Sequence, residues 1–192
     1  MKKSIYDIEI TDTNNKTTTL AQFKGQVLII VNVASKCGLA QKNYEALSEL
    51  IDDFYDEGLR ILLFPCNNFL KQEPGEMKEI EEMVKNINKR FILFNKINVI
   101  EKGLMSYIGE HNGDQHELYK YLTENFYNGW MGKSIKWNFT KFIINRSGKI
   151  VGRFGPSDYL KSNNALLLKA METRKTQSSN EIDENLENIT SE

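Results

Sequence analysis

The sequence is poor in the residues that build disulfide frameworks and membrane segments. Its 192 residues include only two cysteines and three prolines. Two cysteines are too few for a disulfide scaffold, and no apolar segment of signal-peptide length begins the chain, so we expect a reducing, cytoplasmic location. No apolar run approaches the roughly 20 residues that cross a bilayer. We therefore expect no stable membrane insertion, and we expect no bound metal.

An excess of charge of either sign is also missing. The chain has 25 basic and 26 acidic residues, for a net charge of −1. A protein that binds nucleic acid or an anionic membrane carries a basic patch, so we expect neither as a partner. The apolar fraction of 40% suits one domain with a sizeable core. We place that domain at residues 1–173 and expect 174–192, which have almost no large apolar residue, to form a disordered polar tail.

The apolar pattern predicts an alternating order of strands and helices. The expected elements are a hairpin over 5–20, a buried strand 27–33, a helix 41–55, a buried strand 59–65, a helix 76–88, a short strand 91–94, a helix 118–126, a hairpin of strands 139–145 and 149–154, and a helix 159–173. The first strand, helix and strand with tight connections imply a right-handed parallel crossover. Followed by a hairpin and a helix, this is the thioredoxin-like order, an α/β fold with a central mixed sheet flanked by helices.

One cysteine lies where the first buried strand gives way to a helix. At such a place the helix dipole and unpaired backbone N–H groups favour the thiolate over the thiol. A dithiol oxidoreductase needs Cys-x-x-Cys, but Ala40 stands three residues after Cys37. Peroxide reduction, acyl transfer and an inert buried cysteine remain open as interpretations of Cys37.

Three segments carry motifs that the parallel strands would bring to one edge of the sheet. They read Asn-Val-Ala-Ser-Lys-Cys-Gly at 32–38, Phe-Pro-Cys-Asn-Asn-Phe-Leu-Lys-Gln-Glu-Pro-Gly at 64–75, and Lys-Trp-Asn-Phe-Thr-Lys-Phe at 136–142. Together they resemble the motifs of the glutathione peroxidase family, in its cysteine-containing, non-selenium form. The resemblance runs from about Tyr6 to about Leu168.

The resemblance implies that Cys37 is the peroxidatic residue and that Gln72, Trp137 and Asn138 are its polar partners. These side chains carry uncharged N–H donors, which can hold a thiolate and stabilise the oxygen that leaves when the O–O bond breaks. A helix terminus supplies only about 1 kcal/mol toward the thiolate. Each charge-assisted hydrogen bond adds roughly 1.5–3 kcal/mol, so two or three of these donors are needed.

The resemblance also implies that the reductant is an external thiol, either glutathione or thioredoxin, and that no cofactor is bound. Members of the family that use thioredoxin carry a resolving cysteine in the helix after Gln-Glu-Pro-Gly, where this chain has Lys85. Cys66 could substitute, but its place at a strand end favours a buried structural thiol. Glutathione is therefore the first expectation. Lys36, Lys133 and Lys136 are candidates to attract its carboxylates.

The chain departs from the family pattern at several positions. Asn68 replaces Gln and Leu70 replaces Gly, so the loop before Gln72 can take another path. Ala40 replaces a Thr at the helix start, which removes a cap worth about 1 kcal/mol. A longer segment at 99–115 suggests an elaborated surface loop. The short stretch at 127–135 favours a monomer or small oligomer whose site is open to bulky lipid hydroperoxides.

Two other functions compete with a peroxidase. A peroxide-sensing relay or interaction protein on the same scaffold would share the first oxidation of Cys37. Cysteine acyl transfer needs a histidine base, and neither His111 nor His116 lies in the matching motifs.

Overall fold

A mixed five-stranded sheet forms the centre of the molecule. The computed structural model describes residues 4–101, 113–126, 132 and 134–172. The strand order is β5-β4-β3-β6-β7, with β3 parallel to β4, β4 parallel to β5, and both other pairs antiparallel. The strands are β3 (Val27–Val33), β4 (Leu59–Pro65), β5 (Ile92–Leu93), β6 (Lys141–Ile144) and β7 (Ile150–Phe154). The predicted α/β class with a central mixed sheet is confirmed.

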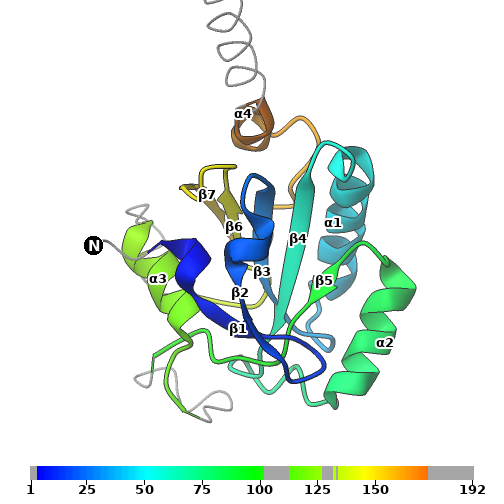
Figure 1. Cartoon of the computed structure of the whole chain (residues 1–192). Helices are drawn as coiled ribbons and strands as arrows, with labels where there is room; N and C mark the ends of the chain where they lie inside the picture. Colours follow the sequence, from blue (N-terminus) through cyan, green and yellow to red (C-terminus); the bar gives the residue numbers. More distant parts are fainter. Residues whose placement is uncertain (1–3, 102–112, 127–131, 133, 173–192) are drawn as a thin grey trace, which may run out of the picture.

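Helices cover both faces of this sheet (Figure 1). One face packs against α1 (Ala40–Phe54), α2 (Met77–Ile87) and α4 (Ala165–Glu172). The other packs against α3 (Glu117–Asn125) and the N-terminal segment. That segment consists of η1 (Ile5–Asp7), the antiparallel pair β1 (Glu9–Thr11) and β2 (Thr17–Thr19), and η2 (Leu20–Phe23). The predicted N-terminal hairpin is therefore present.

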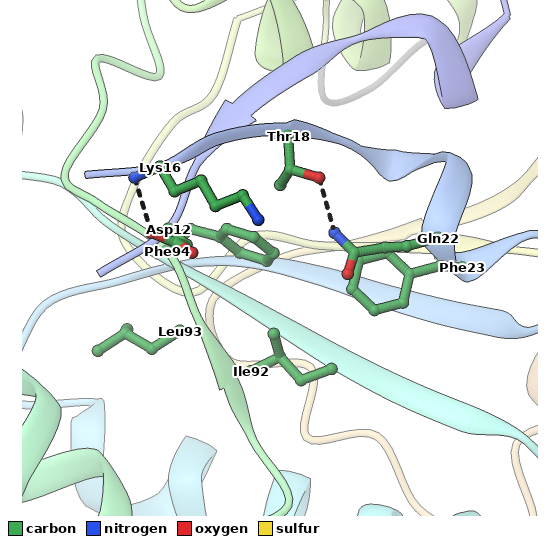
Figure 2. Close-up of a pocket in the computed structure, with 8 residues that line it drawn as sticks. All are labelled: Asp12, Lys16, Thr18, Gln22, Phe23, Ile92, Leu93 and Phe94. Carbon is green, nitrogen blue, oxygen red and sulfur yellow. Dashed lines mark hydrogen bonds between the residues drawn. The ribbon is translucent and has the colours of Figure 1, made fainter. Parts of the chain in front are cut away.

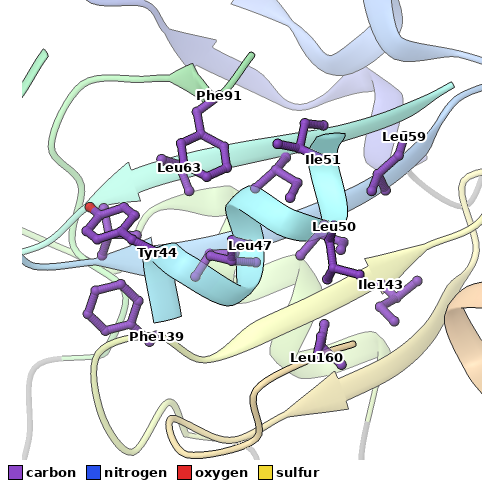
Figure 3. Packing of buried hydrophobic residues seen from close by; sticks show 14 of the residues in the cluster. Tyr44, Leu47, Leu50, Ile51, Leu59, Leu63, Phe91, Phe139, Ile143 and Leu160 are labelled. Atoms are coloured by element: carbon purple, nitrogen blue, oxygen red, sulfur yellow. The ribbon is translucent and has the colours of Figure 1, made fainter. Parts of the chain in front are cut away.

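The two apolar layers meet on β3, as its uninterrupted apolar run predicts. All seven residues of β3 are buried, and alternate side chains enter the two clusters on opposite faces. Figure 3 shows Tyr44, Leu47 and Leu50 of α1 directed at one of these layers. Gly58 adopts φ +93° and turns the chain from α1 into β4, which confirms the predicted left-handed stop.

Several predicted elements are longer in the sequence pattern than in the structure, and three of them show why. The strand predicted from 139 begins at Lys141, because Phe139 adopts φ +63° and the Thr140 N–H donates to a side chain instead of a neighbouring strand. The helix predicted over 159–173 begins at Ala165, since the Asn164 side chain accepts from the first helical N–H groups. The strand predicted over 91–94 is the two-residue β5.

Several expectations fall on residues outside the described part of the chain. These are the tail 174–192, most of the segment 99–115, and residues 127–131 and 133 of the stretch from which the oligomeric state was inferred. Among the described residues, no helix is long and apolar enough to cross a membrane.

The topology gathers the three motifs at one edge of the sheet. The turn with Cys37 and the loop 66–75 follow the carboxyl ends of the parallel strands β3 and β4. Because β6 runs antiparallel to β3, the segment 135–140 that precedes β6 arrives at the same edge.

Candidate active site

Cys37 lies in the tight turn that joins β3 to α1. Its backbone N–H donates to the Ala34 carbonyl (3.3 Å), and its carbonyl accepts from the Ala40 N–H (2.9 Å). The residue is a free cysteine with 7% of its surface exposed. No side chain caps α1, whose N-cap is Leu39 and whose first helical residue is Ala40. The helix therefore presents its uncapped N-terminus close to Cys37, which favours negative charge there.

A buried carboxylate fastens this turn to the loop that carries Gln72. Glu73 is fully buried, and its two oxygens accept from the backbone N–H (2.8 Å) and the hydroxyl (2.6 Å) of Ser35. The Lys36 N–H donates to the Gln72 carbonyl (2.9 Å). Three hydrogen bonds thus hold the Cys37 turn and the Gln72 backbone side by side.

The electrostatics of Glu73 reflect this enclosed position. Burial raises the pKa of its carboxyl group, while the Ser35 hydrogen bonds and the positive charges of Lys96 and Lys36 oppose the rise. The ammonium group of Lys96 also donates to the Glu73 carbonyl (2.9 Å). Sequence analysis gave Glu73 no role, because a glutamate in a loop is normally exposed. Its place in the 64–75 motif was the available signal.

Gln72 and Asn138 are brought into direct contact although 66 positions separate them in the sequence. The Nδ2 of Asn138 donates to the Oε1 of Gln72 (3.0 Å). Asn138 is fully buried, whereas Gln72 is half-buried. The carbonyl oxygen of the Gln72 amide is therefore occupied by protein, and its Nε2 keeps its donor capacity for the site.

Trp137 is half-buried at the boundary of the two core layers. Its ring packs against Phe69, with centroids 5.4 Å apart and an angle of 41° between the planes. Its carbonyl accepts from the Nδ2 of Asn32 (3.2 Å) and from the hydroxyl of Thr140 (3.1 Å). These contacts fix the backbone from which both Trp137 and Asn138 project.

The predicted contact between these donors and the sulfur is not formed in this structure. In the part of the chain that the structure describes, the Sγ of Cys37 takes part in no hydrogen bond. The structure joins Gln72 to Asn138 and the Gln72 backbone to the Cys37 turn. Donation by Gln72, Trp137 and Asn138 to a thiolate stays a prediction.

The lysines considered for glutathione binding, and the lysine at the position of a resolving cysteine, are exposed where the structure describes them. Lys36 and Lys136 are exposed, and Lys133 lies outside the described residues. Lys85, at the position of a resolving cysteine, is exposed on α2 and pairs with Glu81 at 2.9 Å.

Cys66 directly follows the last residue of β4 and is fully buried, as predicted for a thiol at a strand end. Its sulfur accepts from the Nδ2 of Asn32 (3.5 Å) and donates to the Oδ1 of Asn138 (3.4 Å). Burial is the main cause that raises the pKa of this thiol to about 12. Sequence analysis missed the contact with Asn138, because sequence spacing carries no signal for it.

His116 does not support acyl transfer. His116 caps α3, where its Nδ1 accepts from the Leu118 N–H (3.1 Å), and burial lowers its pKa. His111 lies outside the described residues. Within the described ranges, no group of three or more His, Cys, Asp or Glu side chains could hold a metal ion.

Two cavities differ in their relation to this site. One of about 270 Å³ lies between the N-terminal hairpin and β5, and none of the predicted site residues lines it (Figure 2). Another of about 460 Å³ lies between α1 and α2 and includes Ser35 and Ala40, which flank Cys37 in the sequence.

A family model and individual relatives match this sequence. A family model described as glutathione peroxidase matches residues 5–123. The probable phospholipid hydroperoxide glutathione peroxidase of Encephalitozoon cuniculi is 40% identical over 173 residues, which cover 88% of this chain and 91% of that protein. Glutathione peroxidase 1 of Caenorhabditis elegans is 46% identical over 156 residues, covering 80% of this chain and 88% of that protein.

Solved structures agree with these relatives. The structure of T. cruzi GPX1 has a TM-score of 0.67 and 30% sequence identity, and the match covers 88% of this chain and 97% of that chain. A thiol:disulfide interchange protein of the thioredoxin family from Chlorobium tepidum matches with a TM-score of 0.56 and 13% identity, over 88% of this chain and 96% of that chain. The second likeness shows the fold alone, and the predicted thioredoxin-like fold is confirmed. Because the family model spans most of the chain and the curated relatives match over most of their length, this chain belongs to the glutathione peroxidase family and is a peroxidase oxidoreductase.

Proposed function

We propose that this peroxidase reduces hydrogen peroxide and organic or lipid hydroperoxides through Cys37. The thiolate attacks the terminal peroxide oxygen, an S–O bond forms, and the O–O bond breaks. The sulfur loses two electrons and becomes a sulfenic acid. The peroxide gains them, and its other oxygen takes up a proton and leaves as water or an alcohol.

The observation that carries this proposal is the Gln72–Asn138 amide pair fastened beside the Cys37 turn. Because Asn138 occupies Oε1 of Gln72, the donor end of the Gln72 amide is available for a developing negative charge. A donor fixed before the reaction stabilises the leaving oxygen without reorganisation. Trp137, held by Phe69 on one side, supplies a second donor in its indole N–H.

Regeneration requires thiols from outside the chain. A first thiol condenses with the sulfenic acid to give a mixed disulfide and water, and a second thiol releases Cys37 as the thiol. Lys85 stands where a resolving cysteine would be, and Cys66 is fully buried, so we expect direct reduction by glutathione. Thioredoxin acting between molecules is the other reductant to test. Both cysteines are free, as this cycle in a reducing cytoplasm requires.

The cavity between α1 and α2 is an argument that bulky hydroperoxides are among the substrates. Its wall includes Ala40, Tyr44, Met83 and Ile87, which form an apolar surface next to the Cys37 turn. We propose that it receives the apolar part of an organic or lipid hydroperoxide. The printed name of the E. cuniculi relative, which includes phospholipid hydroperoxide, points in the same direction. An antioxidant role in the response to oxidative stress follows from this activity.

Turnover tests the proposal against a peroxide sensor. Purified protein is supplied with hydroperoxide and with either glutathione and its reductase or the thioredoxin system, and NADPH consumption is followed. Steady consumption that Cys37→Ser abolishes supports the peroxidase cycle. One stoichiometric oxidation without turnover on either donor supports the sensor instead. A strong preference for thioredoxin would make glutathione the wrong reductant and leave the peroxidase intact.

A further inference from the structure

A continuous line of hydrogen bonds leads from the middle of the sheet to the Gln72 amide. The Nδ2 of Asn32 on β3 donates to the sulfur of Cys66 (3.5 Å), which donates to the Oδ1 of Asn138 (3.4 Å). The Nδ2 of Asn138 then donates to the Oε1 of Gln72 (3.0 Å). Asn32, Cys66 and Asn138 are each fully buried, so bulk water does not compete for these bonds.

The orientation of the Asn32 amide determines the order of donors and acceptors along this line of hydrogen bonds. The backbone N–H of Thr140 donates to the Oδ1 of Asn32 (3.1 Å), and a backbone N–H can only donate. The Nδ2 of Asn32 must therefore face acceptors, which are the Trp137 carbonyl (3.2 Å) and the sulfur of Cys66. The amide of Asn32 cannot rotate by 180° without losing all three bonds.

The sulfur of Cys66 in turn determines which way the amide of Asn138 faces. It accepts from the Nδ2 of Asn32 and from the backbone N–H of Asn68, so its own hydrogen is the one group left to bind the Oδ1 of Asn138. That bond turns the Nδ2 of Asn138 toward Gln72. The Gln72 amide consequently offers its carbonyl oxygen inward and its Nε2 to the site.

We propose that Cys66 is a positioning residue whose S–H fixes the amide of Asn138 and, through it, presents Gln72 as a hydrogen-bond donor to the reacting oxygen. The inference rests on the proposed function. It gives the second thiol a role in the peroxide step and none in disulfide exchange. The thiol keeps its proton at neutral pH because burial raises its pKa to about 12.

Without a donor at position 66, Asn138 can rotate its amide. Its Oδ1 would then have no partner, and exchange of its two ends would turn the Gln72 amide as well. Gln72 would present an oxygen to a thiolate and to a leaving oxygen, where repulsion replaces donation. Peroxide reduction should slow although Cys37 and Gln72 are both present.

The test compares Cys66→Ala with Cys66→Ser in a single turnover. The second-order rate of Cys37 oxidation by hydrogen peroxide is measured without reductant, by stopped-flow fluorescence and mass spectrometry. Removal of the donor should lower this rate about tenfold. Serine keeps one donor and two acceptor lone pairs, so its rate should return to within about threefold of the parent. Cys66→Val, which fills the volume without a donor, replaces the alanine variant if that variant does not fold.

A double-mutant cycle with Gln72→Ala separates positioning from general damage. If Cys66 acts through Gln72, Cys66→Ala has little further effect once Gln72 is truncated. Parent-like oxidation in Cys66→Ala, a serine variant as slow as the alanine variant, or additive effects in the cycle would each overturn the inference. A resolving role for Cys66 would leave oxidation unchanged and stop turnover, which also overturns it. A parent protein whose Cys37 ignores peroxide would instead overturn the proposed function.

Discussion

The two cysteines follow neighbouring parallel strands of one sheet, and both are buried, but their hydrogen-bond surroundings differ. Cys66 comes directly after β4, is fully buried, and shares hydrogen bonds with Asn32 and Asn138. Cys37 lies beyond the end of β3 at the start of α1, and in the described part of the chain its sulfur has no hydrogen-bond partner. Position at the carboxyl end of a strand therefore does not make a thiol reactive. The reactivity of a thiol depends on its burial and on its hydrogen-bond partners.

This difference is the basis of the separate roles that we propose for the two sulfurs. The thiolate is the nucleophile, and burial raises the pKa of Cys66 to about 12, so at neutral pH this residue is a thiol. As a thiol it can donate one hydrogen bond, which a thiolate cannot. Cys37 lies beside the uncapped N-terminus of α1 and is the residue that we propose as the nucleophile.

Alkylation of the native protein should show the largest effect. At pH 7.5, iodoacetamide should label Cys37 at least about a hundredfold faster than Cys66, because the reaction needs an accessible thiolate. The measurement is the time course of labelled peptides by mass spectrometry. In urea, where both residues are exposed, the two rates should become similar. Comparable labelling of both cysteines in the folded protein would remove the contrast on which the assigned roles depend.

Glu73 interacts with the surroundings of both cysteines, and its own ionisation should make the stability of the protein depend on pH. Its carboxylate binds Ser35 in the turn before Cys37, and its charge contributes to the raised pKa of Cys66. Burial raises the pKa of Glu73 itself above its usual 4.5. The folded state therefore holds the Glu73 proton more tightly than the unfolded state does.

The sign of the resulting effect on stability follows from this difference. The contribution of Glu73 is greatest below its unfolded pKa and declines as the pH rises through the raised folded value. Glu73→Gln does not titrate there, so this variant should gain stability relative to the parent between about pH 4 and neutrality. Urea unfolding of both proteins at several pH values measures the gain.

Glu82→Gln, at an exposed position on α2, is the matched control for this experiment. A stability difference between Glu73→Gln and the parent that stays constant with pH, or that shifts toward the parent as pH rises, would contradict the raised pKa. The turn before Cys37 would then be held by a carboxylate that carries no cost of burial.

The sequence was informative about the sheet and about the reactive turn. The apolar run of Val27–Val33 predicted a strand buried on both faces, and β3 has these bounds. The change from strand to helix pattern placed Cys37 correctly in the turn between them. Both follow from local periodicity, because the strand and helix repeats differ. The family motifs implied that Gln72 and Asn138 belong to one site, but their direct hydrogen bond was not predicted.

The parts that sequence could not give depend on individual hydrogen bonds between distant segments. The apolar pattern of 139–145 predicted a strand, but the contact of Thr140 with Asn32 and the positive φ of Phe139 delay it to Lys141. The line from Asn32 through Cys66 to Asn138 likewise joins residues from three segments. Periodicity records which side chains are buried and not which polar atoms pair.

The loop that follows Cys66 offers the smallest expected effect. Leu70 stands where the family has glycine, and it adopts φ +52° with 53% of its surface exposed. The left-handed conformation destabilises a residue with a Cβ by about 1–2 kcal/mol. Glycine avoids this strain, but its greater loss of backbone entropy on folding cancels part of the benefit. Leu70→Gly should raise the free energy of unfolding by about 0.5–1 kcal/mol. Leu70→Ala keeps the Cβ and should show no increase in urea unfolding. Equal behaviour of the two variants would mean that the loop before Gln72 carries no backbone strain at this position.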